Sequence, residues 1–277
     1  MTAARHLEAA EAAAGLPRTR NGIAYRQEGE GLPLVLMHGS AGSWRHWARN
    51  IPALAETRSV VALDLPGYGD SLGIDPDTSV DAYVELVADA ILELCGRDDP
   101  VDLAGFSFGG QIAAGAAARL GPRARRLALL TPSGFGQPTG RVLALPRRKD
   151  FDPSEAGRRE FHRRMLLAMM LAEPASADDQ AIDIQDANTR LARFDNRRIS
   201  WSGRMPALLA EIGCPILLAY GADDVMPFPS YADRIALCRE VRPDIEVALV
   251  PRAGHWLQYE RPVETNRLLT AFFHPAA

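Results

Sequence analysis

The sequence is almost devoid of lysine. Lys149 is the only lysine among the 31 Lys and Arg residues, and it lies in the charged run 147–150. Schiff-base chemistry and a Walker-type phosphate site both require a lysine, so neither can exist in this chain except at Lys149. Cysteine is also sparse, since Cys95, Cys214 and Cys238 stand far apart and form no Cys-x-x-Cys pair. This spacing predicts free thiols in a reducing compartment and argues against disulfides or a zinc cluster.

Long apolar runs are missing too. No stretch approaches the roughly 18 apolar residues that span a bilayer, and residues 1–16 lack the apolar segment of a signal peptide. The formal net charge of -4 argues against a nucleic-acid binder. With 47% hydrophobic residues, the chain can nevertheless bury a substantial core. We therefore expect a cytoplasmic monomer or homodimer with no membrane or nucleic-acid partner.

Short apolar runs alternate with helical patterns from residue 22 onward. We expect strands at 22–26, 34–37, 59–63, 101–105, 126–130, 215–220 and 245–250. Helical patterns fall at 43–56, 79–95, 108–120, 230–241 and 261–273. Strands and helices that alternate in this way predict an α/β fold whose central sheet is mostly parallel and is flanked by helices.

The alternation lapses between residues 135 and 206. That segment is Arg-rich and helical in character, so we expect a helical cap inserted into a core of residues 20–134 and 207–277. We expect residues 1–19 to be an N-terminal extension with a short helix at 3–15. The cap carries 12 Arg and one Lys against 10 acidic residues, a net +3, which leaves -7 on the rest of the chain. Such a cap would suit a carboxylate-bearing small molecule, although a charged run is commonly just a solvated face.

Residues 105–109 fit the pattern G-x-S-x-G, with Ser107 at its centre. A predicted buried strand precedes the motif and a helix rich in small residues follows it. A nucleophile on so sharp a turn needs neighbours without bulk, which explains Gly105 and Gly109. The start of the helix also supplies backbone N–H groups where negative charge develops. The context predicts a nucleophile elbow; the alternative is a structural turn with a capping serine.

A serine nucleophile needs a base, and the base needs an acid that orients it. Of the three histidines after Ser107, only His255 follows a predicted strand, at the end where α/β sheets bind ligands. His162 falls inside the cap and His274 near the C-terminus. Asp223 and Asp224 end the strand at 215–220, in the expected chain order. We choose Asp224 as the acid and keep Asp223 as the alternative.

Taken together, the motifs make the chain resemble the serine-nucleophile branch of the α/β-hydrolase superfamily, which includes esterases and meta-cleavage-product hydrolases. They are His-Gly-Ser at 38–40, the Asp-Leu-Pro-Gly segment at 64–71, the elbow at 105–110, Gly-Ala-Asp-Asp at 221–224 and Gly-His-Trp at 254–256. The resemblance implies an oxyanion hole made by the backbone N–H groups of Ser40 and Phe108. It also implies a structural role for His38 and supports Asp224 over Asp223.

This triad implies hydrolysis through an acyl-enzyme, without metal or cofactor. Our first hypothesis is a small, mainly hydrophobic carboxylic ester as substrate, because an alkoxide leaves more easily than an amine or a carbanion. The alternative is cleavage of a C–C bond in a 2-hydroxy-6-oxo-dienoate. Lesser alternatives are a cofactor-free perhydrolase or haloperoxidase and a ligand-binding receptor on the same fold.

Candidate pocket residues follow from the same comparison. Trp256 directly follows the predicted base, as it does in the meta-cleavage-product hydrolases, whereas Phe106 stands where those enzymes often have asparagine. The alternative for Trp256 is a packing residue. Arg163, Arg164 and Arg190 are the cap cations that we would test as partners of a substrate carboxylate.

Overall fold

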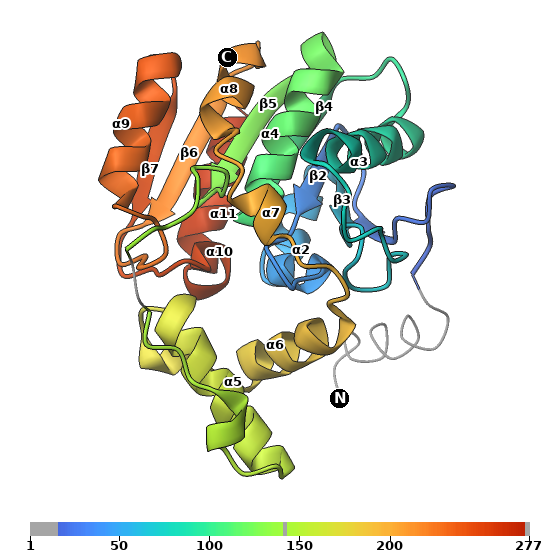
Figure 1. Ribbon diagram of the computed structural model, residues 1–277. Coiled ribbons are helices and arrows are strands. Elements are labelled where there is room, and N and C mark those ends of the chain that lie inside the picture. The colour runs from blue at the N-terminus through green and yellow to red at the C-terminus, as the bar shows by residue number, and fades with distance from the viewer. Residues whose placement is uncertain (1–15, 141–142, 275–277) are drawn as a thin grey trace.

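The computed structural model describes residues 16–140 and 143–274 (Figure 1). The helix predicted at residues 3–15 lies outside these ranges. In the described part of the chain, seven strands form one sheet in the order β1-β3-β2-β4-β5-β6-β7. β1 pairs antiparallel with β3, and every other neighbouring pair is parallel. The strands are β1 (Tyr25–Glu28), β2 (Pro33–Met37), β3 (Ser59–Leu63), β4 (Val101–Phe106), β5 (Ala124–Leu130), β6 (Ile216–Gly221) and β7 (Glu246–Val250).

Helices cover both faces of this sheet. One face packs against α3 (Val80–Cys95), α4 (Phe108–Leu120), α8 (Met205–Glu211) and α9 (Tyr231–Val241). The other packs against the short helix η1 (Trp44–Trp47), α2 (Ile51–Ala55), α10 (Leu257–Glu260) and α11 (Pro262–Phe273). The predicted α/β fold, with a mostly parallel central sheet flanked by helices, is therefore confirmed.

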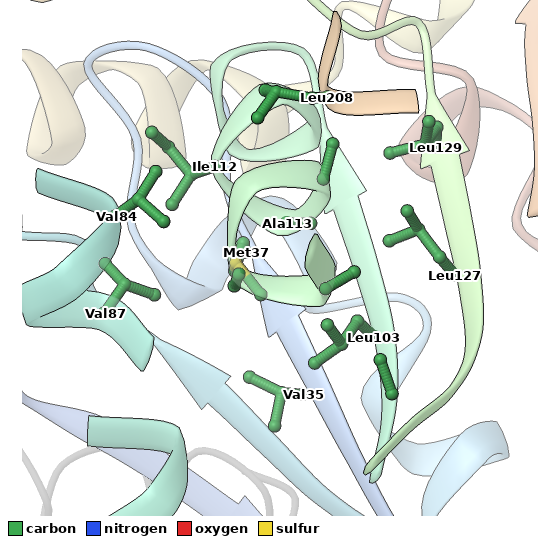
Figure 2. Packing of buried hydrophobic residues seen from close by; sticks show 14 of the residues in the cluster. Val35, Met37, Val84, Val87, Leu103, Ile112, Ala113, Leu127, Leu129 and Leu208 are labelled. Atoms are coloured by element: carbon green, nitrogen blue, oxygen red, sulfur yellow. The ribbon is translucent and has the colours of Figure 1, made fainter. Parts of the chain in front are cut away.

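Each central strand is buried on both faces because its side chains alternate between the two helical layers. In β2, Val35 and Met37 face α3 and α4, whereas Leu34 and Leu36 face the opposite layer. Figure 2 shows the first layer, in which Leu103 and Leu127 of the sheet approach the helices. Burying each such side chain stabilises the fold by roughly 1.5–3 kcal/mol.

The long connection between β5 and β6 leaves these layers. It contains η3 (Arg148–Asp150), α5 (Glu155–Met169), η4 (Pro174–Ser176), α6 (Asp179–Leu191), α7 (Arg197–Ser200) and, on its return, α8. Side chains of Ser154 and Asp178 cap the N-termini of α5 and α6. In Figure 1, α5 and α6 lie together below the sheet, beyond the end at which β5 finishes. We call residues 135–204 the inserted segment, because α8 already packs on α4.

Three local features differ from the predictions. The strand expected at 22–26 is β1, which starts at Tyr25. The helix expected at 43–56 divides into η1 and α2, and Pro52 stands in the first turn of α2, where its missing N–H costs nothing. Helix α10 was not predicted, because four residues are too few for a helical period. In the described ranges, no helix has both the length and the apolar character to cross a bilayer.

Candidate active site

Ser107 occupies a sharp turn between β4 and α4. Its backbone has φ 52° and ψ -114°, a conformation that costs a non-glycine residue about 1–3 kcal/mol. Glycines make the turn possible on both sides. A Cβ at Gly105 would lie 2.2 Å from the carbonyl oxygen of Gly109, and one at Gly109 would lie 2.4 Å from that of His38. The segment therefore has the geometry that the motif predicts, with a half-buried hydroxyl presented at the end of the sheet.

Two other loops bring a histidine and an aspartate to this hydroxyl. His255, between β7 and α10, places Nε2 2.9 Å from Oγ of Ser107. Its Nδ1 lies 2.9 Å from Oδ2 of Asp224, which follows β6. With the ring proton on Nδ1, that nitrogen donates to the carboxylate, and Nε2 is left to accept the hydroxyl proton. The structure thus joins Ser107, His255 and Asp224 in one hydrogen-bonded chain.

The two adjacent aspartates have different surroundings. The Asp224 carboxylate is fully buried, and its Oδ1 accepts a hydrogen bond of 2.8 Å from the backbone N–H of Met226. Asp223 is exposed, and its backbone N–H donates to Ala253. Of the two candidates, the structure brings only Asp224 to His255.

Backbone N–H groups lie next to the serine. Phe108 is the first residue of α4, so its N–H has no acceptor within the helix. The loop after β2 approaches from the other side, since a Cβ at Gly39 would lie 3.3 Å from Cβ of Ser107. Ser40 follows in that loop, where Nδ2 of Asn196 donates a 2.6 Å hydrogen bond to its hydroxyl. Among residues 16–140 and 143–274, the N–H of Ser40 has no hydrogen-bond acceptor.

His38 links the loop after β2 to the loop after β3. Its Nδ1 donates to the carbonyl of Gly39 at 2.7 Å, and its Nε2 accepts from the N–H of Leu65 at 2.8 Å. Burial lowers the pKa of His38 to about 4, so the ring stays neutral and both bonds persist near neutral pH. The implied structural role therefore has a direct explanation.

Two buried polar residues near the site were missed. The carboxylate of Asp64 accepts hydrogen bonds from the N–H groups of Trp44 at 2.7 Å and Asp70 at 2.8 Å. Burial raises the pKa of Asp64 to about 6. His46 accepts a hydrogen bond from the N–H of Gly39, and burial lowers its pKa well below the usual value. The position of Asp64 at a strand end was a usable signal, whereas nothing in the sequence singles out His46.

Phe106 and Trp256, which are predicted to line the substrate pocket, have fully buried side chains that pack against the residues around the triad. The ring of Phe106 lies 5.2 Å from that of His255. Trp256 donates from Nε1 to the carbonyl of His46 at 2.9 Å and stacks on Tyr259. Both residues thereby support the loop that carries His255.

The three candidate arginines are engaged within the inserted segment. Arg164 forms a 2.7 Å ion pair with Glu160, and Arg190 forms one of 2.7 Å with Asp186. Arg163 donates to the carbonyl of Ala177. Each side chain is thus hydrogen-bonded to a neighbour on α5, on α6 or in the turn between them, while 40–63% of its surface stays exposed. The part of the chain that the structure describes contains no group of three His, Cys, Asp or Glu residues that could hold a metal ion.

Comparison with known proteins agrees with this geometry. A family of alpha/beta hydrolases matches residues 34–268, so the chain belongs to the alpha/beta hydrolase family. The chain is 28% identical over 267 residues to a 2-hydroxymuconate semialdehyde hydrolase of Pseudomonas sp. (strain CF600), covering 90% of this chain and 89% of the relative. It is 30% identical over 253 residues to the dihydrolipoyllysine-residue acetyltransferase component of the acetoin cleaving system of Pseudomonas putida. That match covers 87% of this chain but only 63% of the relative.

Among solved structures, the naproxen esterase of Bacillus subtilis superposes with a TM-score of 0.74 at 21% identity. The alignment covers 97% of this chain and 96% of the esterase. At this identity the likeness shows a shared fold. Relatives of the chain thus include a protein named as a 2-hydroxymuconate semialdehyde hydrolase, and proteins of the same fold include an esterase.

Proposed function

We propose that this protein is a serine hydrolase that cleaves small, mainly hydrophobic carboxylic esters through an acyl-enzyme. The observation that carries the proposal is the pair of 2.9 Å contacts that link Ser107 to His255 and His255 to Asp224. Such a hydrogen-bonded triad converts a weakly nucleophilic hydroxyl into one that can attack a carbonyl carbon.

In the first step, His255 Nε2 takes the hydroxyl proton while Ser107 Oγ bonds to the ester carbonyl carbon. The carbonyl oxygen becomes negative and accepts hydrogen bonds from the N–H groups of Phe108 and Ser40. When the tetrahedral species collapses, the C–O bond to the alcohol breaks, and the alkoxide takes the proton from His255. Asp224 stabilises the imidazolium between these two transfers.

Water completes the cycle by the same route. His255 removes a proton from water, the resulting hydroxide adds to the acyl carbon, and Ser107 leaves with that proton. The carboxylic acid departs and the triad returns to its starting state. In both half-reactions the proton passes through Nε2 of His255, which lies 2.9 Å from Oγ of Ser107.

A second candidate is hydrolysis of a C–C bond in a 2-hydroxy-6-oxo-dienoate. It is favoured by the 28% identical relative named for 2-hydroxymuconate semialdehyde, which aligns over most of both chains. The same triad serves, but the leaving group is a carbanion that must be protonated. The engagement of Arg163, Arg164 and Arg190 inside the inserted segment speaks against these side chains as partners of the dienoate carboxylate.

A substrate panel separates the two candidates. Wild-type protein and Ser107→Ala are assayed on p-nitrophenyl acetate, butyrate and octanoate beside 2-hydroxymuconate semialdehyde. We expect the short esters to be hydrolysed and Ser107→Ala to lose at least about 10³-fold in kcat. Rapid loss of the dienoate absorbance with feeble esterase activity would replace the first candidate by the second. Undiminished ester turnover in Ser107→Ala would refute Ser107 as the nucleophile.

A further inference from the structure

Glu260 is a buried carboxylate that the triad does not use. It is the last residue of α10, the short helix that follows His255, and it is only 5% exposed. This helix turns the chain back, so the carboxylate reaches the loop in front of His255. A buried carboxylate needs compensating partners, and its partners identify what it does.

Three backbone N–H groups converge on the Glu260 carboxylate. Gly254, the residue before His255, donates to Oε2 at 2.7 Å. Glu173 donates to Oε1 at 2.7 Å, and Ala172 is shared between the two oxygens at 3.0 and 3.1 Å. Hydrogen bonds to a charged acceptor are roughly twice as strong as neutral ones. One side chain therefore fastens the histidine loop to the inserted segment just beyond α5.

A second bond fastens the other side of His255. The N–H of Trp256 donates to the carbonyl of Met170 at 2.7 Å. The contact leaves no spare room, because a Cβ at Gly254 would lie 2.8 Å from that carbonyl and 2.9 Å from the nitrogen of Ala172. The residues before and after His255 are thus both held by residues 170–173 of the inserted segment, directly or through Glu260.

We propose that Glu260 is a positioning residue. By linking the loop of His255 to the inserted segment, it holds Nε2 of His255 at hydrogen-bond distance from Oγ of Ser107. The inference rests on the proposed function, because the position of His255 relative to Ser107 matters for the rate only if His255 transfers the serine proton. A misplacement of about 1 Å in a reacting group can cost about 10²-fold in rate. Glu260 itself acts through the backbone of Gly254 and does not touch the reacting atoms.

Glu260→Gln tests this directly. The amide replaces one acceptor oxygen by an NH₂ group. This group cannot accept the hydrogen bond that a backbone N–H donates to the carboxylate. For p-nitrophenyl acetate we expect kcat to fall about 10- to 100-fold while KM changes by less than about 2-fold. Glu264→Gln is the matched control, since Glu264 is an exposed carboxylate four residues further on. Glu260→Asp keeps both oxygens but draws them back by one methylene, so its kcat should fall between those of wild type and Glu260→Gln.

A second measurement does not depend on a substrate. The Nδ1 proton of His255 should give a downfield NMR resonance that shifts or broadens in Glu260→Gln and stays unchanged in Glu264→Gln. Wild-type kcat and resonance in Glu260→Gln would overturn the proposal. If Glu260→Gln does not fold, wild-type kcat in Glu260→Asp overturns it. If wild-type protein hydrolyses no ester, the proposed function fails, while the resonance still decides the role of Glu260.

Discussion

Asp224 Oδ2 lies 2.9 Å from Nδ1 of His255, while Asp223, its neighbour in the chain, is exposed to solvent. The chain leaves β6 at Gly221, and a Cβ there would lie 2.2 Å from the carbonyl oxygen of Gly254. The loops after β6 and β7 therefore touch at this point, which brings the Asp224 carboxylate to Nδ1 of His255. Two carboxylates that are adjacent in sequence thus have unequal roles.

Asp224→Asn should reduce kcat/KM for ester substrates by about 10³- to 10⁴-fold. The amide favours the wrong imidazole tautomer and cannot stabilise the imidazolium. Asp223→Asn should stay within about 2-fold of wild type, because its side chain lies in solvent. Steady-state kinetics on p-nitrophenyl butyrate decides the matter, and a larger loss in Asp223→Asn would reverse the assignment.

Gly109→Ala should destabilise the elbow. Its Cβ would meet the carbonyl oxygens of His38 and Met37 at 2.4 and 2.5 Å, and backbone atoms of a central strand cannot withdraw. We expect a loss of about 3 kcal/mol in the free energy of unfolding, at the upper end of overpacking effects. Gly73→Ala is the control, since a Cβ there meets nothing within 4 Å. Urea unfolding curves of equal midpoint for the two variants would contradict the steric argument.

Between about pH 4 and pH 6, the titrations of His38 and Asp64 should change the free energy of unfolding in opposite directions. The pKa of His38 is lowered to about 4 in the fold, so the unfolded chain binds its proton first and stability falls as the pH drops below 6.5. The pKa of Asp64 is raised to about 6, so the folded state binds the extra proton and stability falls as the pH rises from 3.8 to 6. The two contributions largely cancel in wild-type protein.

Asp64→Asn should uncover the histidine contribution. Relative to wild type, its free energy of unfolding should rise more steeply from pH 4 to pH 6, by about 3 kcal/mol in total. Denaturant titrations at half-unit pH steps measure the slope. His38→Gln is the converse variant, and its slope should tilt the other way. Identical slopes in all three proteins would show that neither group titrates in this window.

The ion pair of Arg58 and Asp102 should matter far more than surface pairs do. The two groups are 3% and 0% exposed, Nη1 lies 2.8 Å from Oδ2, and Arg125 contacts the same carboxylate oxygen. Arg58→Met removes a cation from a buried anion and should cost about 3 kcal/mol of stability. Arg119→Met breaks the half-exposed pair with Glu85 and should cost less than about 1 kcal/mol. A Tm that falls equally in both variants would argue that Arg125 alone satisfies Asp102.

Local sequence patterns were sufficient to predict the features of this protein that depend on neighbouring residues alone. Buried strands appear as continuous apolar runs, and the elbow appears as a nucleophile between two glycines, so β4, α4 and Ser107 could be predicted. Glu260 could not, because its partners Ala172 and Glu173 lie almost ninety residues away in sequence. His46 and the packing roles of Phe106 and Trp256 likewise depend on how distant segments meet.

The contacts that Glu260 and Trp256 make with residues 170–173 use only backbone atoms of that segment. The side chains of Ala172 and Glu173 can therefore be replaced, in natural sequences or in a mutant library, without loss of these bonds, whereas Leu171 is buried in the same core cluster as Trp256. Proline at position 172 or 173 is the exception, since it has no N–H to donate. The anchorage of the histidine loop therefore constrains the backbone at positions 172 and 173 and leaves their side chains unconstrained.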